Sequence, residues 1–148
     1  MANATQTKFG YPETLIAETD YWTLQTRPAQ PTLGSLVLVC KEAVGAFGAV
    51  SPEAFADLGR TIPRIEAMLQ AAIGYQRINY LMLMMVDPDV HFHVLPRYEG
   101  EKRLGDITLA DSSWPGAPDL GKAVTLSPAE LQILRDHLRT HWATDVTE

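Results

Sequence analysis

Two histidines and an acid stand at alternate positions between residues 89 and 93 of this chain. Asp89, His91 and His93 are separated by apolar residues in the run Asp-Val-His-Phe-His-Val-Leu. Alternate side chains of a β-strand point to opposite faces, so this spacing predicts three ionisable groups on one face and apolar groups on the other. Neighbouring groups on that face would be about 7 Å apart, close enough to converge on one small ligand.

The residues that follow add a positive charge to this strand. Pro96 has no N–H to donate, and Arg97 supplies a guanidinium that stays ionised. Two imidazoles beside an arginine indicate an anion site. The pattern also fits a solvent-facing strand whose polar side carries two histidines by chance. Because the chain has only four histidines and two fall on this face, the functional interpretation is favoured.

The sequence predicts that the elements which position this strand form an antiparallel sheet. Short strands are predicted at Thr14–Glu18 and Tyr21–Thr26, joined by a turn at Thr19-Asp20. An apolar strand follows at Leu36–Cys40. The apolar run Leu81–Val86 is too short to span a membrane and predicts a buried strand before the histidines.

Two helices complete the predicted fold. Ser51-Pro52-Glu53 is typical of a helix start, and apolar residues then recur at three- and four-residue steps over residues 52–73. Pro63 predicts a kink, or two helices meeting near Thr61. Ser127 and Glu130 form a capping-box pattern that opens a C-terminal helix. The sequence therefore predicts an α+β domain over residues 13–148, preceded by a flexible arm over residues 1–12.

Composition excludes several classes of protein. A net charge of −6 and a pI near 5.1 argue against a general nucleic-acid binder, which needs a basic face. The single cysteine, Cys40, cannot form an internal disulfide. No leader pattern, run of 18 apolar residues or lipidation signal is evident, so the prediction is a soluble cytoplasmic protein with no membrane partner.

Two features lie outside the histidine strand. His137 and His141 are four apart on the C-terminal helix, a spacing that could hold a metal, but no nearby residue completes such a site. They are better explained as solvated residues favoured at a helix C-terminus. Trp114 lies in an irregular, proline-rich loop and could stack near the site or a partner subunit, or fill the edge of the core.

The histidine strand resembles the signature of the histidine triad (HIT) superfamily of nucleotide hydrolases and transferases. That motif is His-φ-His-φ-His-φ-φ, with φ apolar, often followed by Pro-Arg. Residues 89–95 match six of its seven positions, with Asp89 in place of the first histidine, and Pro96-Arg97 follow. Upstream, residues 33–39 resemble the family's Pro-Gly-His strand, with Ser35 where a histidine is usual. The resemblance covers roughly residues 12 to 100.

The resemblance implies a reaction for the central histidine. His91 would attack the α-phosphorus of a nucleotide to form a nucleotidyl-histidine that water hydrolyses. His93 would bind the phosphate oxygens, and Asp89 would either repel an anionic substrate or orient His91. The substrate would be a dinucleoside polyphosphate of the Ap4A type or an adenylated small molecule. No metal or other cofactor is predicted.

The resemblance also bears on phosphate binding and assembly. No Gly-Gln-Ser/Thr phosphate loop precedes the motif, and Thr26 or Gln25 would have to replace the asparagine that the family often places after its second strand. Ser35 and Arg97 complete the predicted phosphate-binding set. HIT proteins are commonly homodimers, so the same is expected here, with residues 79–86 or the long helix near the two-fold axis.

Two alternatives to a hydrolase remain open at this point. Asp89 and Ser35 depart from the family pattern, so the protein could bind nucleotides without efficient catalysis. Alternatively, Asp89, His91 and His93 could hold a metal ion between two imidazoles and a carboxylate.

Overall fold

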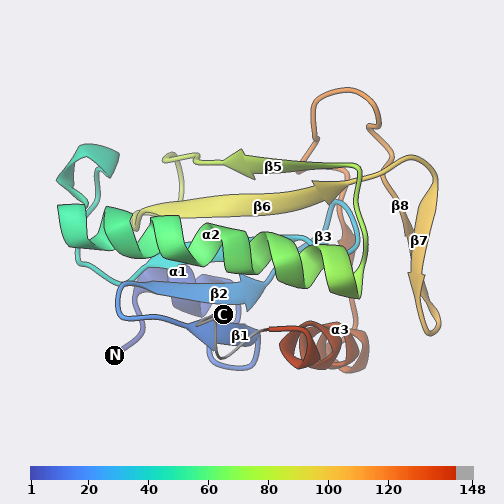
Figure 1. The fold of residues 1–148 in the computed structure, drawn as a ribbon, viewed down its shortest axis with the longest axis horizontal. Coiled ribbons are helices and arrows are strands. Elements are labelled where there is room, and N and C mark those ends of the chain that lie inside the picture. The colour runs from blue at the N-terminus through green and yellow to red at the C-terminus, as the bar shows by residue number, and fades with distance from the viewer. Residues whose placement is uncertain (143–148) are drawn as a thin grey trace.

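A five-stranded antiparallel sheet is the central element of the computed structural model, which describes residues 1–142 (Figure 1). Its strands run in the order β1-β2-β4-β6-β5, and every neighbouring pair is antiparallel. Their bounds are β1 Leu15–Glu18, β2 Trp22–Thr26, β4 Leu36–Cys40, β5 Arg77–Leu81 and β6 His91–Arg97.

The remaining elements surround this sheet. The helices are α1 Ala4–Lys8, α2 Pro52–Ala72 and α3 Pro128–Thr140, with a 3₁₀ turn, η1, at Phe47–Ala49. Two small ladders pair β3 Ala29–Gln30 with β9 Val124–Thr125, and β7 Glu101–Leu104 with β8 Ile107–Ala110. The predicted α+β architecture, with about five strands, a long helix and a C-terminal helix, is confirmed.

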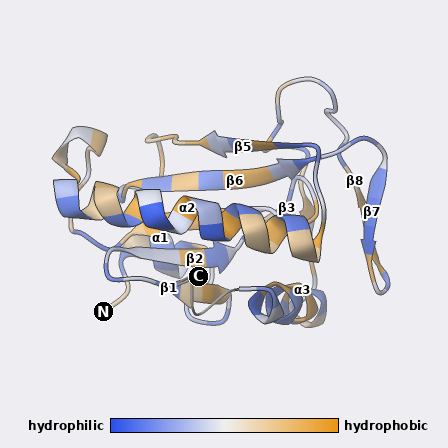
Figure 2. Cartoon of the chain, viewed as in Figure 1, coloured by the Kyte–Doolittle hydropathy of each residue, from blue (hydrophilic) through white to orange (hydrophobic). Residues whose placement is uncertain are grey.

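Helix α2 covers one face of the sheet and packs its buried side into the main core. Ser51 caps it by accepting from the Ala54 amide, and the apolar stripe buries side chains such as Leu58 and Ile65 against the strands. Figure 2 shows apolar and polar residues alternating along α2, as expected of a helix with one buried side. The helix continues through Pro63. Buried side chains before and after Pro63 pack on the same sheet, and this packing keeps the segment as one helix. The predicted alternative of two helices meeting near Thr61 is therefore not observed.

The prediction of a buried strand over Leu81–Val86 is wrong. Strand β5 ends at Leu81, and Met85 and Val86 are 90% and 82% exposed. Leu81 already pairs with His93, two residues from the start of β6, so almost no partner strand remains for the rest of the run. The apolar side chains that follow Leu81 instead belong to a loop that returns the chain to His91.

Residues 1–12, where a flexible arm was predicted, contain α1 and lie against the sheet face opposite α2, with α1 behind the sheet in Figure 1. Phe9 packs on Val37 and Val39, and Gln6 Nε2 donates to Thr23 Oγ1 at 2.9 Å. Asn3 caps the helix in a box with Gln6. A helix of five residues is too short to show a helical period in sequence, which is why the pattern gave no sign of it.

Helix α3 is anchored at the edge of the sheet and at the end of α2. Leu134 and Leu138 are fully buried, and the predicted capping box of Ser127 and Glu130 is present. His137 is not simply solvated, because its Nε2 lies 2.8 Å from the carbonyl oxygen of Ala72. In the described part of the chain, no helix is both long and apolar enough to cross a membrane.

Candidate active site

Strand β6 places His91 and His93 together on the sheet face opposite α2. His91 pairs with Val39 and His93 with Val37, while Phe92 packs on the opposite side with the main core. The two imidazole rings are 5.2 Å apart between centroids and nearly perpendicular. The predicted sharing of one face by these two histidines is therefore present in the structure.

The orientation of His91 is set by a backbone carbonyl. Its Nδ1 lies 2.7 Å from the carbonyl oxygen of Asp89, and the side chain is 1% exposed. Since a carbonyl can only accept, Nδ1 must carry the proton, which leaves Nε2 with a free lone pair in the neutral ring. The nearest carboxylate to Nε2 is that of Asp87, with Oδ2 at 3.9 Å. The unprotonated nitrogen is the one that a nucleophilic imidazole needs.

The carboxylate of Asp89 is directed at α1, which lies on the histidine face of the sheet, and it does not line the cavity beside the histidines. Its Oδ2 accepts from the Thr5 amide at 3.1 Å, and its own amide donates to Thr5 Oγ1 at 3.2 Å. The Cys40 amide donates to the Val90 carbonyl oxygen at 2.9 Å and Val90 packs in the main core on the α2 side, which is consistent with the predicted alternation back to Asp89. The acid satisfies a free amide in the first turn of α1 and tethers that helix, while its backbone carbonyl orients His91.

His93 is held in a neutral state by its surroundings. It is 5% exposed, and the ring of Phe9 meets it edge to face at 5.8 Å between centroids. Burial, followed by the charge of Arg27, lowers the pKa of His93 to about 4. Its Nδ1 is buried and has no hydrogen-bond partner among the described residues.

This depressed pKa predicts a pH dependence of folding. Between about pH 6.5 and 4 the unfolded chain binds a proton at His93 that the folded chain does not, so the free energy of unfolding should fall as the pH drops through that window. Denaturant unfolding from pH 4 to 8 should show a smaller fall for His93→Asn than for wild type. Equal pH dependence of the two proteins would contradict the neutral, buried state of His93.

A cavity of about 330 Å³ opens beside the two histidines. Its polar lining comes from Lys8, Arg27 and Asp87, and Lys8 Nζ lies 2.6 Å from Asp87 Oδ1. Two cations face one carboxylate, so the histidines stand in a cavity of net positive charge. The apolar lining is supplied by Phe9, Leu83, Met85 and Val86. This lining suits an anion that carries an apolar or aromatic portion.

Three of the predicted phosphate-binding residues do not line this cavity. Gln25 Nε2 donates to the carbonyl oxygen of Gln6 and to Thr14 Oγ1, and so holds the N-terminal segment on the sheet. Ser35 Oγ donates to the carbonyl oxygen of Thr32 at 2.8 Å within a buried turn. Thr26 alternates with Trp22 and Leu24, which places it on the face that α2 covers.

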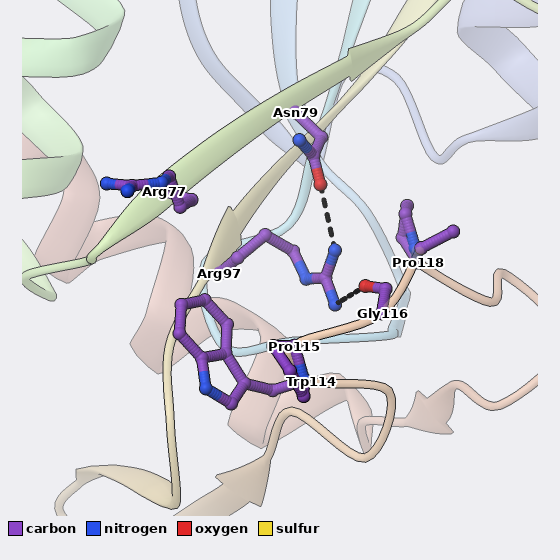
Figure 3. A pocket seen from close by; sticks show the side chains of 8 residues that line it. Arg77, Asn79, Arg97, Trp114, Pro115, Gly116 and Pro118 are labelled. Carbon is purple, nitrogen blue, oxygen red and sulfur yellow. Dashed lines mark hydrogen bonds between the residues drawn. The ribbon is translucent and has the colours of Figure 1, made fainter.

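Arg97 lies at the other end of β6, in a different cavity of about 560 Å³. Its guanidinium is engaged by Asp111, with Nε 2.7 Å from Oδ2, and it also donates to Asn79 Oδ1 and to the Gly116 carbonyl oxygen. Figure 3 shows the guanidinium directed between Asn79 and Gly116, with Trp114 beside it. Arg97 therefore anchors the Trp114 loop and does not line the histidine cavity. Trp114 lines the same cavity as Arg97.

One of the two cations beside the histidines is Arg27, the residue directly after the strand predicted at Tyr21–Thr26. Its amide donates to the Ser35 carbonyl oxygen at 3.0 Å, so the pairing of β2 with β4 continues one residue past Thr26. Alternation then puts Arg27 on the same face as Gln25, the face of His93. Extending the two-residue period of the strand by one position would have found it.

The metal-binding alternative has no geometric support in the described residues. Within residues 1–142, no group of three or more His, Cys, Asp or Glu side chains is arranged to hold a metal ion. The Asp89 carboxylate, which that alternative requires, is turned toward Thr5.

These observations define a class of protein: an α+β domain that presents two alternating histidines beside a cationic cavity, on a five-stranded antiparallel sheet with one long helix behind it. The fold is that of histidine triad proteins, as the sequence resemblance predicted. A histidine triad protein of Sinorhizobium meliloti matches with a TM-score of 0.74 and 21% identity, over 95% of this chain and 96% of that one.

Two further structures show the same likeness. A histidine triad protein of Marinobacter aquaeolei gives a TM-score of 0.66 at 17% identity, over 96% of this chain and 95% of its own. A hypothetical histidine triad nucleotide-binding protein of Sulfolobus tokodaii gives 0.67 at 14% identity, over 86% and 82%. Neither a protein-family model nor a curated protein matches the sequence. Because the sequence identities are low, the likeness to these structures establishes the fold alone.

Proposed function

We propose that this protein binds a nucleotide in the histidine cavity and hydrolyses it through a nucleotidyl-His91 intermediate. The observation that carries the proposal is the contact of His91 Nδ1 with the Asp89 carbonyl oxygen, which makes Nε2 the nitrogen that bears the lone pair in the neutral ring. The fold it shares with proteins such as the Sulfolobus tokodaii histidine triad nucleotide-binding protein supports the same ligand class. The candidate substrates are dinucleoside polyphosphates and AMP joined to a small molecule.

The proposed reaction has two displacements at phosphorus. The Nε2 lone pair of His91 forms a bond to the α-phosphorus, and the bond to the leaving group breaks with its electron pair. Water then attacks the same phosphorus, loses a proton, and displaces His91 to give the nucleoside monophosphate. His93 stands beside His91 on the same face, where a ring N–H can donate to the phosphoryl oxygens as charge builds on them.

The other predicted site residues take indirect parts in this proposal. Asp89 is a positioning residue whose carbonyl orients His91. Gln25 and Ser35 stabilise the segments around the cavity through their hydrogen bonds. The resemblance also implies a homodimer, and β5, an edge strand of the sheet, is the segment that we propose to lie near the two-fold axis.

Offering a panel of AMP derivatives to the purified protein tests the proposal. Diadenosine polyphosphates and AMP amides should release AMP, measured by chromatography, and rapid quenching should trap a protein heavier by one nucleotidyl group. Calorimetry with AMP measures binding separately. Binding without product would select the alternative of a nucleotide-binding protein, which the replacement of a motif histidine by Asp89 favours. A folded protein that binds none of these nucleotides would contradict both.

A further inference from the structure

Arg27 is a cation without a counter-anion in the wall of the histidine cavity. Its guanidinium donates to the carbonyl oxygen of Ala29, and its Nε is buried with no hydrogen-bond partner. None of the carboxylates in residues 1–142 forms an ion pair with it. Burial also lowers the pKa of this guanidinium. Withdrawing a charge from water without a partner costs free energy, which a bound anion would recover.

Lys8, the second cation of the cavity, is in a different state. Its ammonium pairs with Asp87 at 2.6 Å and its side chain is 51% exposed. The charge of Lys8 is therefore already balanced and hydrated. Of the two cations, only Arg27 has hydrogen-bonding capacity held out of water and left unused.

A second unused group lies in the same wall. His93 Nδ1 is also buried without a partner, and both side chains line the cavity. His93 lies next to His91 on one strand face, so a phosphoryl group near His91 Nε2 would be within reach of that wall. Two residues of one cavity wall thus each carry a buried nitrogen without a hydrogen-bond partner, and an unsatisfied buried polar group in a native structure calls for an explanation such as a ligand-binding site.

We propose that Arg27 binds the phosphoryl oxygens of the nucleotide that His91 attacks. This inference rests on the proposed function and assigns the phosphate contact to a guanidinium, where Thr26 or Gln25 was expected to serve. Arg27 can supply two donors to one phosphate, and its charge balances that of the substrate. The site would therefore select ligands with an ionised phosphate over the corresponding nucleosides.

Calorimetry with AMP and with adenosine, on wild type and on Arg27→Gln, tests this inference. AMP should bind the variant tenfold or more weakly, as expected from the loss of a charged hydrogen bond worth about 1.5–3 kcal/mol. Adenosine should bind both proteins alike, and Arg27→Lys should recover part of the AMP affinity. The AMP deficit should shrink at high salt. Arg103→Gln removes the same charge from the exposed β7–β8 hairpin and should leave AMP binding unchanged.

The outcomes separate this inference from the proposed function. Wild-type turnover together with equal AMP affinity of wild type and Arg27→Gln would overturn the Arg27 assignment alone. Equal weakening of AMP and adenosine would also overturn it, because it would show a structural role. If wild type itself bound no nucleotide, both would fail. If Arg27→Gln fails to fold, two other measurements decide: the AMP affinity of Arg27→Lys, and the ratio of AMP to adenosine affinity of wild type at low and high salt. A ratio that is the same at both salt concentrations would count against Arg27.

Discussion

Replacement of His91 by alanine is expected to lower nucleotide turnover by about a thousandfold or more, because it removes the atom that forms the covalent bond. Binding of AMP should persist, since the cavity cations remain. The rate of AMP release from the best substrate of the panel, followed by chromatography, measures the loss. Intact mass after rapid quenching should show no nucleotidyl adduct on the variant.

Two controls guard this result against loss of folding. His91 is buried, so His91→Asn, which leaves a smaller cavity than alanine, should be inactive with a thermal unfolding transition close to wild type. His141→Ala removes the exposed histidine at the C-terminal cap of α3 and should keep full turnover. Undiminished turnover in a folded His91 variant would refute the nucleophile assignment.

Replacement of Asp111 by asparagine should destabilise the fold by about 3–5 kcal/mol, because it leaves the guanidinium of Arg97 buried without a counter-charge. Arg97 is 4% exposed and Asp111 7%, and Asp111 Oδ2 also accepts from the Tyr98 amide. Urea unfolding at pH 7 measures the change. The effect should appear in stability, while the histidine cavity, at the other end of β6, keeps its nucleotide affinity.

A surface pair provides the comparison. Lys41 and Glu18 are 33% and 40% exposed, so Lys41→Met should change stability by only about 0–1 kcal/mol. The double variant Arg97→Met/Asp111→Leu should recover much of the loss, since it removes both buried charges. A cost below about 1 kcal/mol for Asp111→Asn would show that the pair is not buried in solution.

Local patterns predicted most of the elements. The helix caps at Ser51 and Ser127, the β1–β2 turn and the strand at Leu36–Cys40 all depend on neighbours in sequence, and the structure has them. The shared face of His91 and His93 also follows from a two-residue period. These signals need no knowledge of distant partners.

The errors arise where a distant partner decides. The strand predicted at Leu81–Val86 does not form because β5 ends at Leu81, near the start of its partner β6 at His91. The residues of the run give no sign of where that partner begins. The guanidinium of Arg97 forms an ion pair with Asp111, which comes 14 residues later. Asp89 turns to Thr5, 84 residues away. Arg97 and Asp89 were assigned to the site by type and position, and the side chain of each is held by a contact that only the fold brings about.

The contact between Lys8 and Asp87 joins α1 to the loop that follows β5, and both residues line the histidine cavity. Because Lys8 is half exposed, water competes for its charge, and the pair contributes only about 0–1 kcal/mol. The link between α1 and this loop is therefore weak, and added salt weakens it further.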